Sequence, residues 1–337
     1  MSNMNQGFKW LKVGLLASLF FTAITTRAQQ EPQYTQFMFN KLPINAGYTG
    51  GRDVLSFRAL YRTQWTGIDG HPMTATLSGH SPIKNENMAV GGFIVYDQLG
   101  VTKQTWIDGT YAYRVPMGKG GKTKLSIGIN AGMLMYKANL SELILSHPDD
   151  PSFSENVTRI MPDVGAGLYV YHEYFYVGVS VPNFIPTNLY NKDQMVDLED
   201  QQTAQRVPHM FGMVGGVIPL GKVLKIRPQL MTQNIMSSKY KSPFTMNMNL
   251  SFMFYDRVNV GASYRTAIAN NKDAEERRNG DSFDALMEVW PTKQLMVGYA
   301  YDFTISALRD KKVQTHEIIL GYDFSFDKSK IITPRYF

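Results

Sequence analysis

Apolar and polar residues alternate along residues 123–136. Leu125, Ile127, Ile129, Ala131, Met133 and Met135 share one parity, whereas Ser126, Gly128, Asn130, Gly132 and Tyr136 share the other, with only Leu134 out of place. A period of two predicts a β-strand with one apolar face and one face of small or polar groups. Strands of globular proteins usually have about five or six residues, whereas a tilted strand that crosses a bilayer needs roughly 9 to 11. The stretch is therefore long enough to cross a membrane.

The same pattern recurs through most of the chain. We predict about fourteen strands, at 54–62, 73–80, 89–97, 105–115, 123–136, 163–171, 174–181, 209–218, 223–233, 244–254, 258–268, 283–290, 295–305 and 315–326. Short connections alternate with longer ones, and only 98–103 is short where a long loop is expected. Bacterial barrels have an even number of strands, short periplasmic turns and longer external loops. The sequence therefore predicts an all-β fold, a transmembrane antiparallel β-barrel over residues 53–326, rather than a soluble β-sandwich.

The start of the chain has the features of a secretory signal peptide. Lys9 and Lys12 precede an apolar run at 13–24, and Thr26 and Ala28 supply the small residues of a cleavage site. The run is short for the roughly 30 Å of hydrocarbon that a membrane helix must cross. We therefore predict a cleaved signal peptide over 1–28. Because an exported protein without apolar helices can enter a membrane only as a closed barrel, we expect it in the lipid of the bacterial outer membrane.

Composition narrows the possible functions. The chain has 337 residues and no Cys, which excludes disulfides and thiolate metal sites. Its formal net charge is +6, and the three basic residues of 1–28, which has no acid, leave +3 on the rest. Charge therefore gives little support to nucleic-acid binding.

Two segments have no place in the predicted wall. Residues 29–52 lack a clean period, and Tyr34, Phe37 and Phe39 need cover, which a lumenal plug or a periplasmic docking arm would provide. Residues 327–337 follow the last strand and end in Arg335, Tyr336 and Phe337. Pro334 lacks the donor that a central strand needs. We predict a periplasmic tail that docks through its aromatic and basic end.

Charged residues fall on the predicted inner face in both signs. The basic members are Arg58, Arg62, Arg114, Lys225, Arg227 and Arg265, and the acidic members are Asp108, Asp284, Glu288, Asp302, Glu317 and Asp323. A mixed set can pair across strands, whereas a pore selective for one ion sign would be lined by one sign. Where the first and last strands meet, we expect Glu317 near Arg62 and Asp323 near Arg58.

Several motifs resemble chemical sites but lack a required residue. Residues 120–123 read GGKT, but Pro116 stands where a phosphate-binding loop needs Gly, and the motif opens a strand, not a helix. His316 and Glu317 lack the second His of a zinc motif, because Leu320 stands at that position. His80 beside Ser78 has no acid placed to orient it, so a lumenal polar group is favoured over a hydrolase site.

No other pattern indicates catalysis or ligand binding. The acids Asp149, Asp150, Glu155, Asp197, Glu199 and Asp200 lie in the two longest loops without the ligand spacing of a calcium loop. We therefore expect no catalytic residue, cofactor or metal. Tyr174, Phe175, Trp290 and Tyr301 lie near strand ends, where membrane barrels carry interfacial aromatic girdles.

Three stretches carry a family resemblance over essentially the whole mature chain. EPQYTQFMFNKLPINAGYTG near the start, THEIILGYDFSF in the last strand and the terminal ITPRYF together resemble the PorP/SprF family of Bacteroidota. The resemblance implies an outer-membrane component of the type IX secretion system that supports export of an adhesin and, in some members, gliding motility. It also implies two partners, the periplasmic ring of that machine and the C-terminal sorting domain of a secreted adhesin. A general porin or small-solute transporter stays open, since the fold alone would allow it, and an outer-membrane phospholipase is a distant third.

Overall fold

The computed structural model describes residues 31–83, 86–118, 121–142, 156–189, 205–237, 244–268, 282–305 and 313–324. These ranges belong to one compact unit, Glu31–Phe337. The predicted signal peptide, the tail at 327–337 and the acidic residues of the two longest loops lie outside the described residues.

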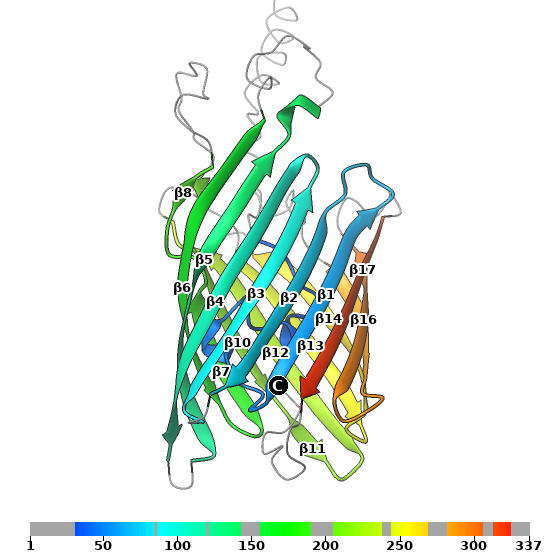
Figure 1. The fold of residues 1–337 in the computed structure, drawn as a ribbon. Helices are drawn as coiled ribbons and strands as arrows, with labels where there is room; N and C mark the ends of the chain where they lie inside the picture. Colours follow the sequence, from blue (N-terminus) through cyan, green and yellow to red (C-terminus); the bar gives the residue numbers. More distant parts are fainter. Residues whose placement is uncertain are drawn as a thin grey trace, which may run out of the picture. The chain divides into compact units, whose positions relative to one another are not determined.

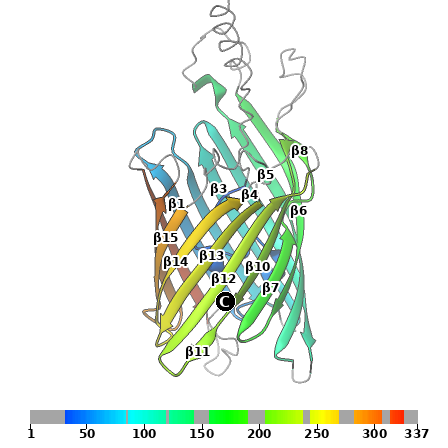
Figure 2. The ribbon, with the colours of Figure 1, turned by 180° about the vertical axis from the view of Figure 1, so that it is seen from behind.

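Fourteen antiparallel strands form a closed barrel (Figures 1 and 2). They are β1 (Leu55–Thr66), β2 (Met73–Pro82), β3 (Met88–Leu99), β4 (Thr102–Met117), β5 (Thr123–Ala138), β6 (Val157–Tyr171), β7 (Phe175–Val181), β10 (His209–Gly216), β12 (Leu224–Ile235), β13 (Phe244–Phe254), β14 (Val258–Ile268), β15 (Ser282–Val289), β16 (Leu295–Thr304) and β17 (Gln314–Phe324). The predicted fold class and strand number are confirmed.

Shorter elements complete the described structure. The three-residue strand β11 (Ile218–Leu220) pairs with β12 beyond the end of β10, so we count the two as one wall strand. Strands β8 (Thr187–Asn188) and β9 (Gln205–Arg206) form a separate two-stranded ladder. Three 3-10 turns, η1 (Phe37–Phe39), η2 (Ala46–Tyr48) and η3 (Leu140–Glu142), are single turns of three residues. No helix in the described part of the chain is long and apolar enough to cross a membrane.

The barrel closes where β1 pairs with β17. The pairing is antiparallel, with Arg62 opposite Glu317 and Ser56 opposite Asp323. A guanidinium nitrogen of Arg62 lies 3.1 Å from a carboxylate oxygen of Glu317, and Arg58 lies 2.9 Å from Asp323. Both ion pairs expected at this seam are present, which confirms the predicted register of the first and last strands.

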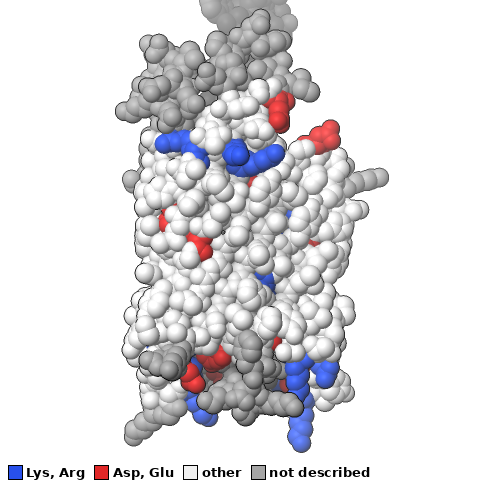
Figure 3. Space-filling view, viewed as in Figure 1, with Lys and Arg blue, Asp and Glu red and all other residues white. Residues whose placement is uncertain are grey.

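Each strand has an apolar outer face and a buried inner face. In β5, Ile127 and Ile129 are exposed outward, whereas Ser126 and Asn130 are buried. Leu134, which breaks the alternation in the sequence, is fully buried on the inner side. In Figure 3 the outer wall is mostly uncharged, and its charged side chains gather toward the two ends. This distribution is the one expected of a barrel wall surrounded by lipid.

The start of β6 differs from the prediction. The strand begins at Val157, six residues before the predicted start at Asp163, yet only Ala166 to Tyr171 pair with the seven-residue strand β7. The backbone of Val164 points to the β7 edge of β6, where its carbonyl accepts a hydrogen bond from the Phe184 N–H at 2.7 Å. Pro162 is two residues earlier, so its backbone points to the same edge. The nitrogen of Pro162 therefore faces a side with no paired strand in the described residues. Proline is tolerated at such an edge because it needs no ladder donor there.

The prediction that Trp290 belongs to an interfacial girdle is wrong. Its side chain is buried, its Nε1–H donates to Glu288, and its ring centroid lies 5.5 Å from the Arg52 guanidinium carbon. The residue follows the end of β15, and the buried acid holds the indole inward. Tyr174 and Phe175, by contrast, are exposed near the start of β7.

Candidate functional site in the barrel lumen

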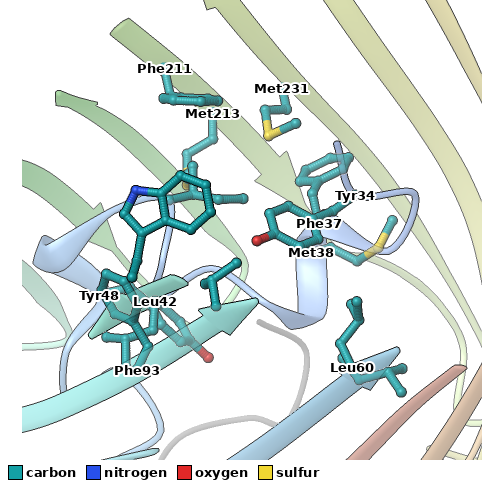
Figure 4. Close-up of a cluster of buried hydrophobic side chains, with 14 of the residues drawn as sticks. Tyr34, Phe37, Met38, Leu42, Tyr48, Leu60, Phe93, Phe211, Met213 and Met231 are labelled. Carbon is teal, nitrogen blue, oxygen red and sulfur yellow. The ribbon is translucent and has the colours of Figure 1, made fainter. Parts of the chain in front are cut away.

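Residues 31–52, here called the inner segment, lie inside the ring of strands. Tyr34, Phe37 and Met38 are buried, as are most of the residues that follow them. In Figure 4, Tyr34 and Phe37 extend toward Met231, while Leu60 lies below Met38. The inner segment has almost no regular structure of its own, so contacts with the wall hold its conformation.

Two acids on the wall, Glu317 and Asp302, bind Thr35 and Gln36 just before η1. The N–H groups of Thr35 and Gln36 donate to the two carboxylate oxygens of Glu317, at 2.9 and 2.6 Å. The Thr35 hydroxyl donates to Asp302 at 2.8 Å. Arg62 lies between these acids, 2.6 Å from Asp302 and 3.1 Å from Glu317. Hydrogen bonds to ionised groups are the stronger kind, so this cluster anchors the inner segment to β1, β16 and β17.

A second anchor is Asn45, the N-cap of η2. Its Nδ2 donates to the carbonyl of Leu168 at 3.1 Å, and its Oδ1 accepts from the Gly47 N–H at 2.8 Å. Gly128 and Gly167 on β5 and β6 leave the room this turn needs, because a Cβ at either position would overlap Ala46 or Asn45. The inner segment thus fills the space that the small inward residues of these strands leave.

The third anchor lies where the inner segment enters β1. The Gly50 N–H donates to His80 Nδ1 at 3.1 Å, and Arg114 donates to the Gly50 carbonyl at 2.7 Å. Arg52 pairs with Asp323 at 2.6 Å. His80 therefore has a structural partner in the backbone, as expected of a lumenal polar group.

Lys41 is a buried lysine within a group of tyrosines. Its ammonium nitrogen lies 3.7 Å from the ring centroid of Tyr176 and 5.3 Å from that of Tyr48, and it donates to the Tyr169 hydroxyl at 3.3 Å. Burial, with the nearby positive charges of Arg227 and Arg52, lowers the pKa of Lys41 well below its usual range.

The other predicted inward charges also lie on the inner face, as opposite pairs or beside polar groups. Arg227 is 3.5 Å from Glu288, Arg265 is 3.8 Å from Asp284, and Asp108 accepts from Asn130 at 3.2 Å. Lys225 has the same parity as Arg227 and lies at the end of the strand, 2.5 Å from the exposed turn residue Asp256.

The predicted contact residues outside the wall are only partly described. Tyr34 and Phe37 are buried, and Phe39 is half-buried with the Arg227 guanidinium 5.5 Å from its ring. Arg335, Tyr336 and Phe337 lie outside the described residues.

Sequence reasoning missed three residues that hold the inner segment: Lys41, Asn45 and Arg52. None stands in a periodic stretch, so their partners could not be read from alternation. One usable signal was the cluster of inward glycines on adjacent strands, since glycine allows another backbone to approach closely.

The arrangement provides binding contacts. Among the described ranges, no group of three or more His, Cys, Asp or Glu side chains is placed to hold a metal ion. The buried charges bind one another and the backbone of the inner segment.

Comparison with solved structures gives several outer-membrane proteins at low sequence identity. Omp33 of Acinetobacter baumannii is 11% identical, covering 81% of this chain and 100% of its own, with a TM-score of 0.44. A Pseudomonas aeruginosa FadL homologue is 11% identical, covering 81% and 89%, with a TM-score of 0.43. The CymD monoaromatic hydrocarbon channel is 10% identical, covering 86% and 93%, with a TM-score of 0.48. Likenesses at this level carry no argument about function.

The sequence itself gives a family. No curated protein matches the chain. The family described as "Type IX secretion system membrane protein PorP/SprF" matches residues 26–322, nearly the whole chain. The protein therefore belongs to the PorP/SprF family of type IX secretion system membrane proteins.

Proposed function

We propose that this outer-membrane barrel supports the export or surface attachment of a cognate adhesin, and that it does so as a binding and assembly protein without catalysis. Family membership makes it a component of the type IX secretion system. The observation that carries the finer proposal is the inner segment, which is bound to β1, β16 and β17 through buried charges and to β6 through Asn45. A porin needs a continuous aqueous path, whereas here the inward charges are used to hold chain inside the barrel.

The proposed partners are the periplasmic ring of the secretion machine and the C-terminal sorting domain of the adhesin. The inner segment reaches β1 at the end of the barrel that carries the short turns, which is the periplasmic side of bacterial barrels. Residues 327–337 follow β17, which ends at the same side. We propose that this tail docks on the ring through Arg335, Tyr336 and Phe337.

The test is removal of residues 331–337 in a strain that lacks the chromosomal gene. Barrel insertion is followed by heat-modifiable migration, and surface adhesin by antibody labelling of intact cells. We expect normal insertion with adhesin export lost, and the full-length chain restoring export. Normal export by the truncated chain would contradict docking, and normal export in the gene deletion would contradict the proposed function.

A further inference from the structure

Two lysines lie side by side on the outer face of the wall. Lys103 of β4 is directly opposite Lys137 of β5 in the antiparallel register. Both have the parity of the lipid-facing residues of their strands, since Ile107 and Met133 are exposed on that face. Side chains opposite each other on one face have Cβ atoms about 4.5 to 5.5 Å apart. The two ammonium groups can therefore reach one ligand.

The lysine pair marks the end of the lipid-facing run. On β5 the outward residues from Leu125 to Met135 are all apolar, and this stretch matches the roughly 9 to 11 residues that a tilted strand needs to cross a bilayer. Lys137 is the next outward residue. On β3, Tyr96 has the outward parity of Ile94 and lies opposite Thr105, and tyrosine concentrates at the membrane interface. The lysines therefore lie at the level of the lipid headgroups.

The headgroup level of the lysine pair is that of the outer leaflet. Lys137 lies near the connection 139–156, whereas the short turn 118–122 joins the opposite ends of β4 and β5. In a bacterial barrel the long connections face outside. Figure 3, in the view that has β1 to β6 in front, shows basic side chains close together near this end of the wall.

No described residue neutralises these two charges. The outward neighbours across the strands are uncharged, namely Gln98 opposite Lys103 and Thr158 opposite Lys137. Neither ammonium has an ion pair or a hydrogen bond with another residue of the described ranges. Like charges directly opposite each other on a sheet are destabilising. An anion held between the two lysines would offset this repulsion.

We infer that Lys103 and Lys137 bind the phosphate of an anionic lipid in the outer leaflet, with its acyl chains on the apolar surface of Ile107 and Met133. A lysine ammonium binds phosphate as a point charge, and its aliphatic stem lies on apolar surface while the charge reaches the headgroups. The occupant is a lipid because the pair is continuous with the lipid-facing wall. This lipid site is independent of the proposed secretion function.

The test measures which lipid lies beside the lysine pair in a bilayer. Because the chain has no Cys, Met133→Cys gives one site for a bimane label on the lipid face of the full mature barrel. The barrel is placed in phosphatidylcholine nanodiscs that contain dibrominated phosphatidic acid or, at the same mole fraction, dibrominated phosphatidylcholine as the quencher. We expect phosphatidic acid to be preferred beside the label about fivefold or more, because lysines at a membrane surface attract anionic lipid.

Removing the two charges tests the residues. Lys103→Gln combined with Lys137→Gln, in the Met133→Cys background, should make the two quenchers equal. Lys222→Gln combined with Lys293→Gln is the matched control, since it removes two exposed lysines from turns at the opposite end of the barrel, and it should keep the preference. Heat-modifiable migration checks that each variant is folded. A preference that survives the loss of Lys103 and Lys137 would overturn the site.

A second label tests whether the preference is local. Met248 on β13 is exposed to a similar extent as Met133, 41% against 43%. Its cross-strand neighbours Leu230 and Tyr264 are uncharged. We expect no preference for phosphatidic acid at a label on Met248→Cys. An equal preference at the two labels would overturn the site, because it would reflect the net charge of the whole barrel.

A soluble phosphate distinguishes the two sources of the anion. Glycerol 3-phosphate has the phosphate of phosphatidic acid but no acyl chains. An excess of it should leave the lipid preference at Met133→Cys in place. Loss of the preference would show that free phosphate occupies the lysines and would overturn the assignment to a lipid.

Discussion

Arg62 shows how one buried residue holds several elements together. It binds Asp302 and Glu317, and its side chain also donates to the Thr35 hydroxyl. Removing one partner of a buried ion pair leaves uncompensated charge, which usually costs about 3 to 5 kcal/mol. Both acids also bind the inner segment, so the loss extends beyond the wall.

We predict that Arg62→Leu lowers the free energy of unfolding by about 3 kcal/mol or more. The measurement is urea unfolding of the refolded barrel in detergent, followed by tryptophan fluorescence. Lys225→Ala is the control, because its partner Asp256 is half exposed, and such pairs contribute about 0 to 1 kcal/mol. Similar losses in the two variants would contradict the anchoring role of Arg62.

Lys41 makes a prediction about pH. Because its pKa is lowered in the folded protein, protonating it there is harder than in the unfolded chain, where the pKa is about 10.4. Stability should therefore rise with pH between the lowered pKa and about 10.4, and should be reduced below that window. The charged and titratable groups around it are Arg227, Arg52 and the three tyrosines.

Lys41→Met keeps the length of the side chain and removes its titration. We expect the unfolding free energy of the parent minus that of Lys41→Met to increase as pH rises from 6 to 9.5, measured by urea unfolding at each pH. A difference that is constant across this range would contradict a lowered pKa for Lys41.

Strands were predictable where one side of the wall faces lipid and the other is polar or small. In β5 and β13 the alternation is nearly unbroken, so both the strand and its inward residues followed from the sequence. The early start of β6 was missed because Pro162 looks like a strand breaker unless the neighbouring edge is known to be unpaired. Trp290 shares the parity of the inward residue Glu288, so alternation places it inside, and its position at a strand end was the misleading signal.

The path of the inner segment was not predictable from periodicity. Its residues bind wall positions more than 200 residues away, such as Glu317, and no repeat in the segment encodes that register. The sequence alone therefore did not decide whether this segment is a lumenal plug or a periplasmic docking arm. The inward glycines of β5 and β6 are the wall residues whose sequence indicates that another backbone packs against these strands.

We predict that Gly128→Val displaces the η2 turn, because the added Cβ would overlap the carbonyl of Ala46. Since the chain has no Cys, Ala46→Cys gives a single labelling site for a water-soluble maleimide. Labelling of this buried site should be slow in the parent background and at least tenfold faster with Gly128→Val. Gly109→Val on the lipid face, where the nearest atom is 3.8 Å away, is the control, and equal rates for the two variants would contradict the packing.

At the scale of the whole molecule, one segment decides between two functional classes. A barrel of fourteen strands with an empty interior would suit a porin, whereas a barrel whose inner charges hold its own chain suits a binding and assembly component. The same contacts that stabilise the inner segment therefore carry the functional proposal.

The most direct test of this account is single-channel conductance in a planar bilayer, comparing the full mature chain with a variant that lacks residues 31–50. Heat-modifiable migration first establishes that both barrels are closed. We predict no sustained ion current through the full chain and stable open steps after the deletion. Steady conductance of the full chain equal to that of the deletion variant would contradict the claim that the inner segment closes the barrel.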